Sequence, residues 1–155
     1  MNISELINDY ATGPQKLREA IAGMTPEQID AAPVPGKWST RQVVCHLADF
    51  EPIYADRMKR SIAEDEPTIF GGDPNAFATH LAYEQRDIEE ELLMIESIRK
   101  HVARILRTLP PDAFQRKVNH SEDGPITLQS LLEHITNHIS HHVQFIEEKR
   151  QAMGI

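Results

Sequence analysis

Residues 127–151, TLQSLLEHITNHISHHVQFIEEKRQ, decide the fold because they form one long amphipathic pattern. Thr127 is suited to cap a helix. The apolar side chains that follow recur at helical spacing, at Leu128, Leu131, Leu132, Ile135, Ile139, Val143 and Ile146. At about 100° per residue they fall in one arc, and that arc must face a core. The stretch therefore predicts a long helix that packs against other helices.

Three other segments have the same periodicity, over about residues 3–24, 40–63 and 84–109. Ser39 and Gln42 have the form of a capping box before the second of them. A short helix is expected after Thr25, and another near Ala76. The pattern predicts an all-α chain, with residues 1–155 forming a single domain built as a four-helix bundle.

Two connections between these helices are unusually long. Residues 65–75 hold two prolines and a pair of glycines, and residues 110–125 begin with Pro110-Pro111. Neither stretch can continue a helix, so both are expected to be irregular loops. Long loops beside a bundle often border a functional site.

Composition argues against several classes of function. With 16 Lys plus Arg against 24 Asp plus Glu, the formal net charge is −8, which disfavours nucleic-acid binding. The single cysteine, Cys45, cannot form an internal disulfide, so a cytoplasmic location is expected. Charges scattered through residues 1–30 argue against a secretory signal. No apolar run approaches the roughly 20 residues that a membrane span needs.

The eight histidines are the unusual feature of the composition. His138 and His142 are one helical turn apart and lie at or inside the apolar arc of the last helix, whereas His134 and His141 fall on its polar flank. His46 lies within the apolar arc of residues 40–63. Three imidazoles that meet inside a bundle can bind one divalent ion, with Zn–N bonds of about 2.0 to 2.1 Å.

The other histidines and the nearby charges have simpler explanations. His80, His101 and His120 are expected to be solvated. Asp49 and Glu51 are candidate acceptors for the outer ring nitrogens of the ligands. Arg57 could place a guanidinium near the site or extend to solvent. The alternative for the whole cluster is a bundle without metal, whose histidines have only hydrogen-bonded partners.

Two sequence elements together resemble the DinB-like superfamily. The first is residues 38–51, WSTRQVVCHLADFE, and the second is GPITL at 124–128 followed by HISHH at 138–142. The resemblance implies an up-down-down-up four-helix bundle and a divalent metal, zinc or nickel, bound by His46, His138 and His142. Members are often dimers, so a homodimer is expected. The sequence departs from many relatives at Phe145, where they have glutamine.

Three imidazole ligands leave coordination positions open, so a water or a thiol could be activated there. The His-Glu-x-x-His motif of zinc proteases is absent, which disfavours a protease. Similar proteins include bacillithiol S-transferases, mycothiol-dependent maleylpyruvate isomerases and proteins described as metal-dependent hydrolases. The first hypothesis is therefore an enzyme that transfers a low-molecular-weight thiol to a small electrophile. The alternatives are a metal-dependent hydrolase of small molecules and a non-catalytic metal-binding or stress-related binding module.

Overall fold

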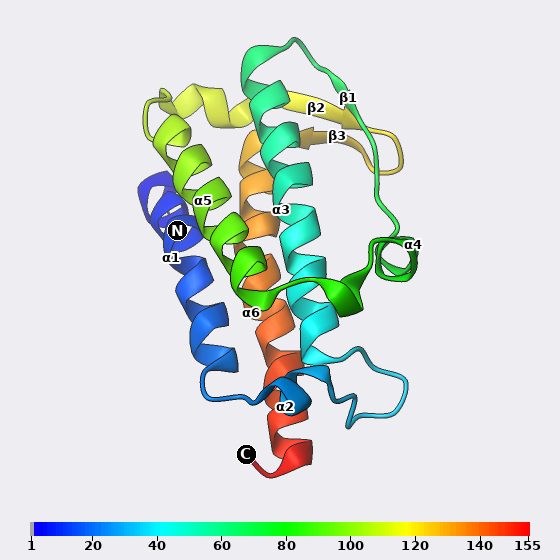
Figure 1. The fold of residues 1–155 in the computed structure, drawn as a ribbon. Coiled ribbons are helices and arrows are strands. Elements are labelled where there is room, and N and C mark those ends of the chain that lie inside the picture. Colours follow the sequence, from blue (N-terminus) through cyan, green and yellow to red (C-terminus); the bar gives the residue numbers. More distant parts are fainter. Residues whose placement is uncertain (1) are drawn as a thin grey trace.

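The computed structural model describes residues 2–155, and four long helices form its body (Figure 1). They are α1 (Ile3–Ile21), α3 (Thr40–Ala63), α5 (Ile88–Leu106) and α6 (Leu128–Met153). Two shorter helices, α2 (Pro26–Asp30) and α4 (Pro74–His80), lie in the connections, together with the 3₁₀ turns η1 (Tyr83–Gln85) and η2 (Pro111–Gln115). The predicted four-helix bundle and both predicted short helices are confirmed.

The four helices have the up-down-down-up arrangement. In Figure 1, α1 and α6 run in one direction while α3 and α5 run in the other. Helix α1 packs against α5 and α6, and α3 packs against the same two helices. Because α3 and α5 are parallel neighbours, residues 64–87 must return along the length of the bundle, and they carry α4 with them.

Capping side chains fix where the helices begin. Ser39 and Gln42 form the predicted capping box at the start of α3, and the Thr127 hydroxyl accepts from the Ser130 backbone N–H at the start of α6. Helix α5 begins later than the sequence predicts, at Ile88 rather than Glu84. The reason is Asp87, whose carboxylate accepts from the Glu90 backbone N–H and so ends the preceding irregular segment.

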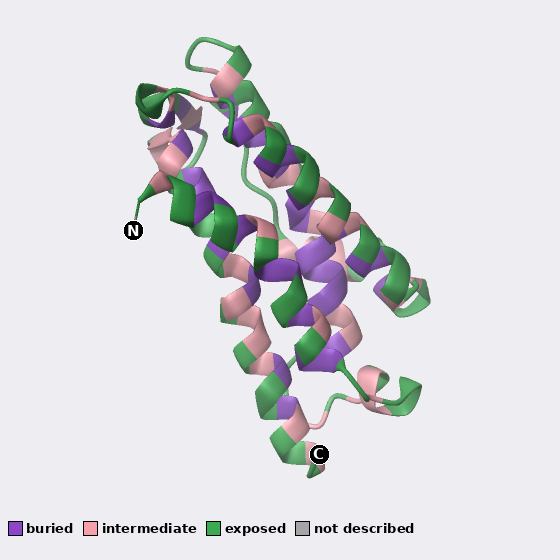
Figure 2. Cartoon of the chain, turned by 90° about the vertical axis from the view of Figure 1, so that its left-hand side faces the viewer, coloured by how far each residue is buried: buried purple, intermediate pink, exposed green. Residues whose placement is uncertain are grey.

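Buried residues line the inward faces of the helices (Figure 2). They form two apolar clusters, one that includes Tyr10, Met58 and Ile135 and one that includes Leu17, Leu47 and Ile139. Burial of these side chains is the main stabilising term of such a bundle.

A fully buried ion pair between Glu51 and Arg99 lies at the boundary of the two clusters. Arg99 donates from Nε and Nη2 to Glu51 Oε1, at 2.9 and 2.7 Å, and from Nη2 to the Ile135 carbonyl at 2.6 Å. Its Nη1 donates to the Tyr10 carbonyl at 3.0 Å. That carbonyl has no partner inside α1 because Pro14, four residues later, lacks an N–H. Arg99 therefore donates a hydrogen bond to the Tyr10 carbonyl, which Pro14 leaves without its usual partner in the helix.

The two long connections are only partly irregular, which corrects the sequence prediction. Strands β1 (Thr68–Ile69), β2 (Lys117–His120) and β3 (Gly124–Thr127) form a small sheet with the order β1-β2-β3. Strand β1 is parallel to β2, and β2 is antiparallel to β3 with His120 opposite Gly124. Alternate side chains of this sheet point into the bundle, so the sheet closes that end of the core.

His120 is buried, so the prediction that it is solvated was wrong. It lies on the inward face of β2, and its Nδ1 accepts from the backbone N–H groups of Glu122 and Asp123 at 3.1 and 3.3 Å. The hairpin that buries it turns through residues 121–123 and enters β3 at Gly124, whose φ is 75°. His80 and His101 are exposed, as predicted.

Within residues 2–155, no helix combines the length and the apolar character that crossing a lipid bilayer requires.

Candidate metal centre

Three histidines from two helices meet inside the bundle. His46 of α3 faces His138 and His142 of α6, and its Nε2 lies 3.0 Å from that of His138 and 3.1 Å from that of His142. One nitrogen from each ring lies within 4.8 Å of the others. His46 is buried, and the other two are half-buried. The structure therefore brings together the three histidines that the sequence singled out.

Local packing explains why these rings converge. His138 and His142 are one turn apart on α6, so both project toward α3. His46 is held between two aromatic rings, with centroids 5.2 Å away at Trp38 and 4.9 Å away at Phe50. Rings fixed in this way can bind an ion without losing much side-chain entropy.

The arrangement fits a divalent metal ion better than hydrogen bonds between the rings. The Nε2 of His46 faces two other Nε2 atoms, and it can supply only one proton between them. A cation accepts all three lone pairs at once. Two nitrogens bound at 2.0 to 2.1 Å to one tetrahedral ion are about 3.3 Å apart, close to the distances found here.

The electrostatics of the site keep the imidazoles in the neutral form that binds metal. Burial lowers the pKa of His46 to about 4, and the Asp49 carboxylate opposes this shift. Burial, with repulsion from the neighbouring histidines, lowers the pKa of His138 to about 2 and that of His142 to about 3. At neutral pH all three rings therefore present unprotonated nitrogens.

The charged residues proposed to support the ligands have other partners. Asp49 pairs with Arg86 at 2.8 Å, and Glu51 pairs with Arg99. Arg57 is buried, donates to the Phe70 carbonyl and lies over the Tyr54 ring. Within residues 2–155, the Nδ1 atoms of the three histidines are buried and have no hydrogen-bond partner.

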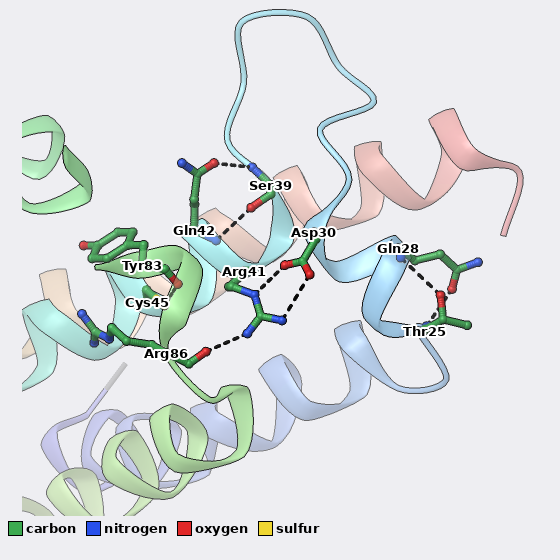
Figure 3. A network of polar contacts seen from close by, with 9 residues as sticks. All are labelled: Thr25, Gln28, Asp30, Ser39, Arg41, Gln42, Cys45, Tyr83 and Arg86. Carbon is green, nitrogen blue, oxygen red and sulfur yellow. Dashed lines mark hydrogen bonds and ion pairs between the residues drawn. The ribbon is translucent and has the colours of Figure 1, made fainter. Parts of the chain in front are cut away.

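A polar network fixes the start of α3, and therefore His46, against the crossover segment (Figure 3). Arg41 donates to Asp30 and, at 2.7 Å, to the Arg86 carbonyl. One turn later the Cys45 thiol donates to the Tyr83 carbonyl at 3.6 Å. Burial raises the pKa of Cys45 to about 12, so this thiol is an inert packing group rather than a nucleophile.

A pocket of about 260 Å³ opens beside the triad. His142 lines it together with Trp38 and Val43 from the start of α3 and with Phe145, Glu148 and Lys149 from α6. Gly36, Lys37 and Asn75 complete its rim. Phe145 lies with its ring centroid 5.6 Å from that of His142 and forms an apolar wall of the pocket. A small molecule in this pocket would lie next to the convergent histidines.

Sequence reasoning missed the three charged residues that line this pocket, Lys37, Glu148 and Lys149. Lys149 had a signal, since it follows Ile146 by three residues and so lies on the apolar face of α6. A lysine at such a position either extends its ammonium to solvent or is buried because it has a functional role. His134 and His141 are exposed on the flank as predicted, with His134 stacked on Tyr54 at 5.2 Å.

Comparison with known proteins agrees with this geometry. Residues 9–146 match the DinB superfamily. YfiT of Bacillus subtilis is 32% identical over 142 residues, which are 91% of this chain and 80% of that protein. A protein of Oceanobacillus iheyensis is 32% identical over 144 residues, 93% of this chain and 83% of its own. Both carry a provisional description as metal-dependent hydrolases.

The solved structure of YfiT has the same architecture. It superimposes with a TM-score of 0.92 at 30% identity and covers 99% of this chain and 90% of YfiT. That protein is described as a probable metal-dependent hydrolase with an unusual four-helix bundle topology. The match extends over nearly the whole chain and includes the segments that carry the three histidines. This chain therefore belongs to the DinB superfamily.

Proposed function

We propose that this protein is a metal-dependent hydrolase of small molecules. The observation that carries the proposal is the convergence of three neutral imidazoles beside a pocket of about 260 Å³. A site with three protein ligands is typical of catalytic metal centres, whereas structural centres have a fourth protein ligand. The descriptions of YfiT and of the relative from Oceanobacillus iheyensis support the same class of reaction.

We infer that His46, His138 and His142 hold the ion, and that zinc or nickel is the metal. Imidazole nitrogen suits both metals, and their binding needs no thiolate or carboxylate ligand. When bound, the ion would supply Lewis acidity and would lower the pKa of a water or thiol beside it. Elemental analysis of protein purified without an affinity tag tests whether an ion is bound and which metal it is, with an expected content of one ion per chain.

Glu148 is the carboxylate among the residues that line the pocket, and it is exposed at the rim. In a hydrolytic reaction it would accept the proton of the attacking water, since Asp49 and Glu51 are engaged with arginines. The apolar walls at Trp38 and Phe145 would orient the substrate. The pocket volume limits that substrate to a small molecule.

Thiol transfer is the second candidate, and one observation favours it. Within residues 2–155, the cluster of potential metal ligands contains no carboxylate, and the carboxylate that lines the pocket, Glu148, is exposed at its rim. A thiol next to a bound ion would have a lowered pKa and would release its proton to solvent without a dedicated base. This reaction would use the same histidines and the same pocket.

A substrate panel separates the two reactions. The metal-loaded protein is assayed for hydrolysis of small esters and amides, and in parallel for conjugation of small thiols to an electrophile. The proposal predicts hydrolysis, and it predicts that Glu148→Gln lowers the hydrolytic kcat by about 100-fold, the usual contribution of a general base. Conjugation without hydrolysis, unchanged in Glu148→Gln, would establish thiol transfer instead.

A further inference from the structure

Lys149 has an environment that is unusual for a lysine. Its side chain, on α6, is only 2% exposed. The ammonium donates to the carbonyl oxygen of Phe145, one turn earlier in the same helix, at 3.1 Å. Within residues 2–155, no carboxylate oxygen lies within 4.0 Å of it. An ammonium has three N–H donors, so this buried cation has donors left over and no counter-ion.

The same lysine lines the pocket that His142 borders. Around it, the walls from Trp38, Val43 and Phe145 are largely apolar. The other charged lining residues, Lys37 and Glu148, are exposed at the rim and have opposite signs. Lys149 therefore leaves the pocket with one net positive charge, and this charge lies in its buried part.

We propose that Lys149 binds the carboxylate of a small, largely apolar substrate whose reactive group lies beside the histidine triad. This inference rests on the proposed function and specifies its substrate class. A single buried ammonium balances one negative charge, which suits a carboxylate better than a dianionic phosphate. A charge-assisted hydrogen bond in such a partly dry site is among the stronger polar contacts.

The titration behaviour of Lys149 agrees with this role. Burial lowers the pKa of its ammonium, the nearby Lys37 lowers it further, and Glu148 opposes the shift. A bound carboxylate would favour the charged form and remove part of the cost of burying it. The carboxylate and Lys149 would therefore stabilise each other, and binding would be selective for anionic substrates.

Trp38 allows a test that does not depend on catalysis, because it is the only tryptophan of the chain and it lines the pocket. Its fluorescence is followed while 3-phenylpropionate, or its neutral counterpart 3-phenylpropionamide, is added to the metal-free and the metal-loaded protein. The two probes have nearly the same shape, so a difference in Kd reports the charge. Lys149→Met is compared with Lys149→Gln and with Lys100→Met, a change at an exposed lysine on α5.

The wild-type protein and Lys100→Met are expected to bind the acid at least about tenfold more tightly than the amide. Both Lys149 variants are expected to lose this preference while still binding the amide. Equal binding of the two probes by the wild type, failure to bind either, or an unchanged preference in both Lys149 variants would overturn the proposal. Metal content, measured on the same samples, reports separately whether the proposed metal centre exists.

Discussion

Two buried polar clusters of this bundle are built on opposite principles. At the boundary between the two apolar clusters, the Arg99 guanidinium makes four hydrogen bonds to Glu51 and to the carbonyls of Tyr10 and Ile135. In the histidine triad, three Nε2 atoms point at one another and three buried Nδ1 atoms have no partner within residues 2–155. The first cluster pairs its two charges and uses most of the Arg99 N–H groups, whereas the second leaves the Nε2 lone pairs facing one another.

The contrast separates structure from function. A buried polar group without a partner costs free energy, and an ion held by the three Nε2 atoms would remove that cost at those nitrogens. The Arg99 cluster neutralises its own charges, with Glu51 Oε2 left without a hydrogen-bond partner within residues 2–155, and it serves to fix how α1, α3, α5 and α6 pack. The triad has its unmet lone pairs directed at one point, which is the arrangement that a cation requires.

Arg99→Met should have the largest effect on stability. It would leave the Glu51 carboxylate buried and unpaired, and the free energy of unfolding should fall by about 3–5 kcal/mol. Urea denaturation measures this loss. Adding Glu51→Leu should restore much of it, because both charges are then gone.

Arg18→Met is the matched control for that experiment. Arg18 pairs with Glu89 and Glu96 on the surface, where its side chain is 31% exposed. Removing this surface ion pair should lower the free energy of unfolding by less than about 1 kcal/mol. If the two arginine variants proved equally stable, the Arg99 cluster would not be the structural element that its hydrogen bonds suggest.

His138→Ala should have an intermediate effect, and only in the presence of metal. The wild-type protein should gain about 2.7 kcal/mol of stability when free metal is at 100 times its Kd, and the variant should gain almost nothing. Thermal melting with added zinc or with chelator measures the difference. His134→Ala, a change at the exposed ring stacked on Tyr54, should behave like the wild type. Full metal stoichiometry in His138→Ala would contradict the ligand assignment.

Apart from the Arg18→Met control, Gly13→Ala should have the smallest effect on stability, and its sign is informative. Alanine normally stabilises a helix interior relative to glycine by about 0.5–1 kcal/mol. Here the new Cβ would lie 2.5 Å from Arg99 Nη1, which its hydrogen bonds hold in place. We expect a loss of about 1–2 kcal/mol in urea denaturation, as for other overpacked sites. In the Arg99→Met background, Gly13→Ala should leave the free energy of unfolding unchanged. An increase in the free energy of unfolding in the wild-type background would show that the Arg99 guanidinium moves freely.

Sequence periodicity was enough to predict the four helices and the caps at Ser39 and Thr127. It also predicted that three histidines face the bundle interior and converge there. These features depend on local spacing, since a helix places residues three or four apart on one face whatever surrounds it. The resemblance to DinB-like proteins supplied the direction of the helices. Spacing alone does not determine it.

The features that the sequence did not predict depend on contacts between distant segments. Strand β1 pairs with β2 across about fifty residues of chain, and no local pattern announces such a pair. Glu51 was expected to support the ligands, yet it pairs with Arg99 on another helix. Arg99 did interrupt an apolar stripe between Ile95 and Val102, a signal that a buried partner lay opposite. Homodimer formation, cytoplasmic location and the absence of nucleic-acid binding stay predictions.

The crossover between α3 and α5 contains positions at which this protein could be altered without disturbing its fold. It must traverse the bundle because its two helices are parallel, and on the way it places Asn75 at the rim of the pocket. Between the buried residues Ile69 and Tyr83, its length and side chains can vary without altering the packed faces of the long helices. One part of the pocket rim can thus be changed separately from the packed helices. A library of variants with substitutions only at residues 70–82 should yield new substrate preferences while the four-helix bundle stays unchanged.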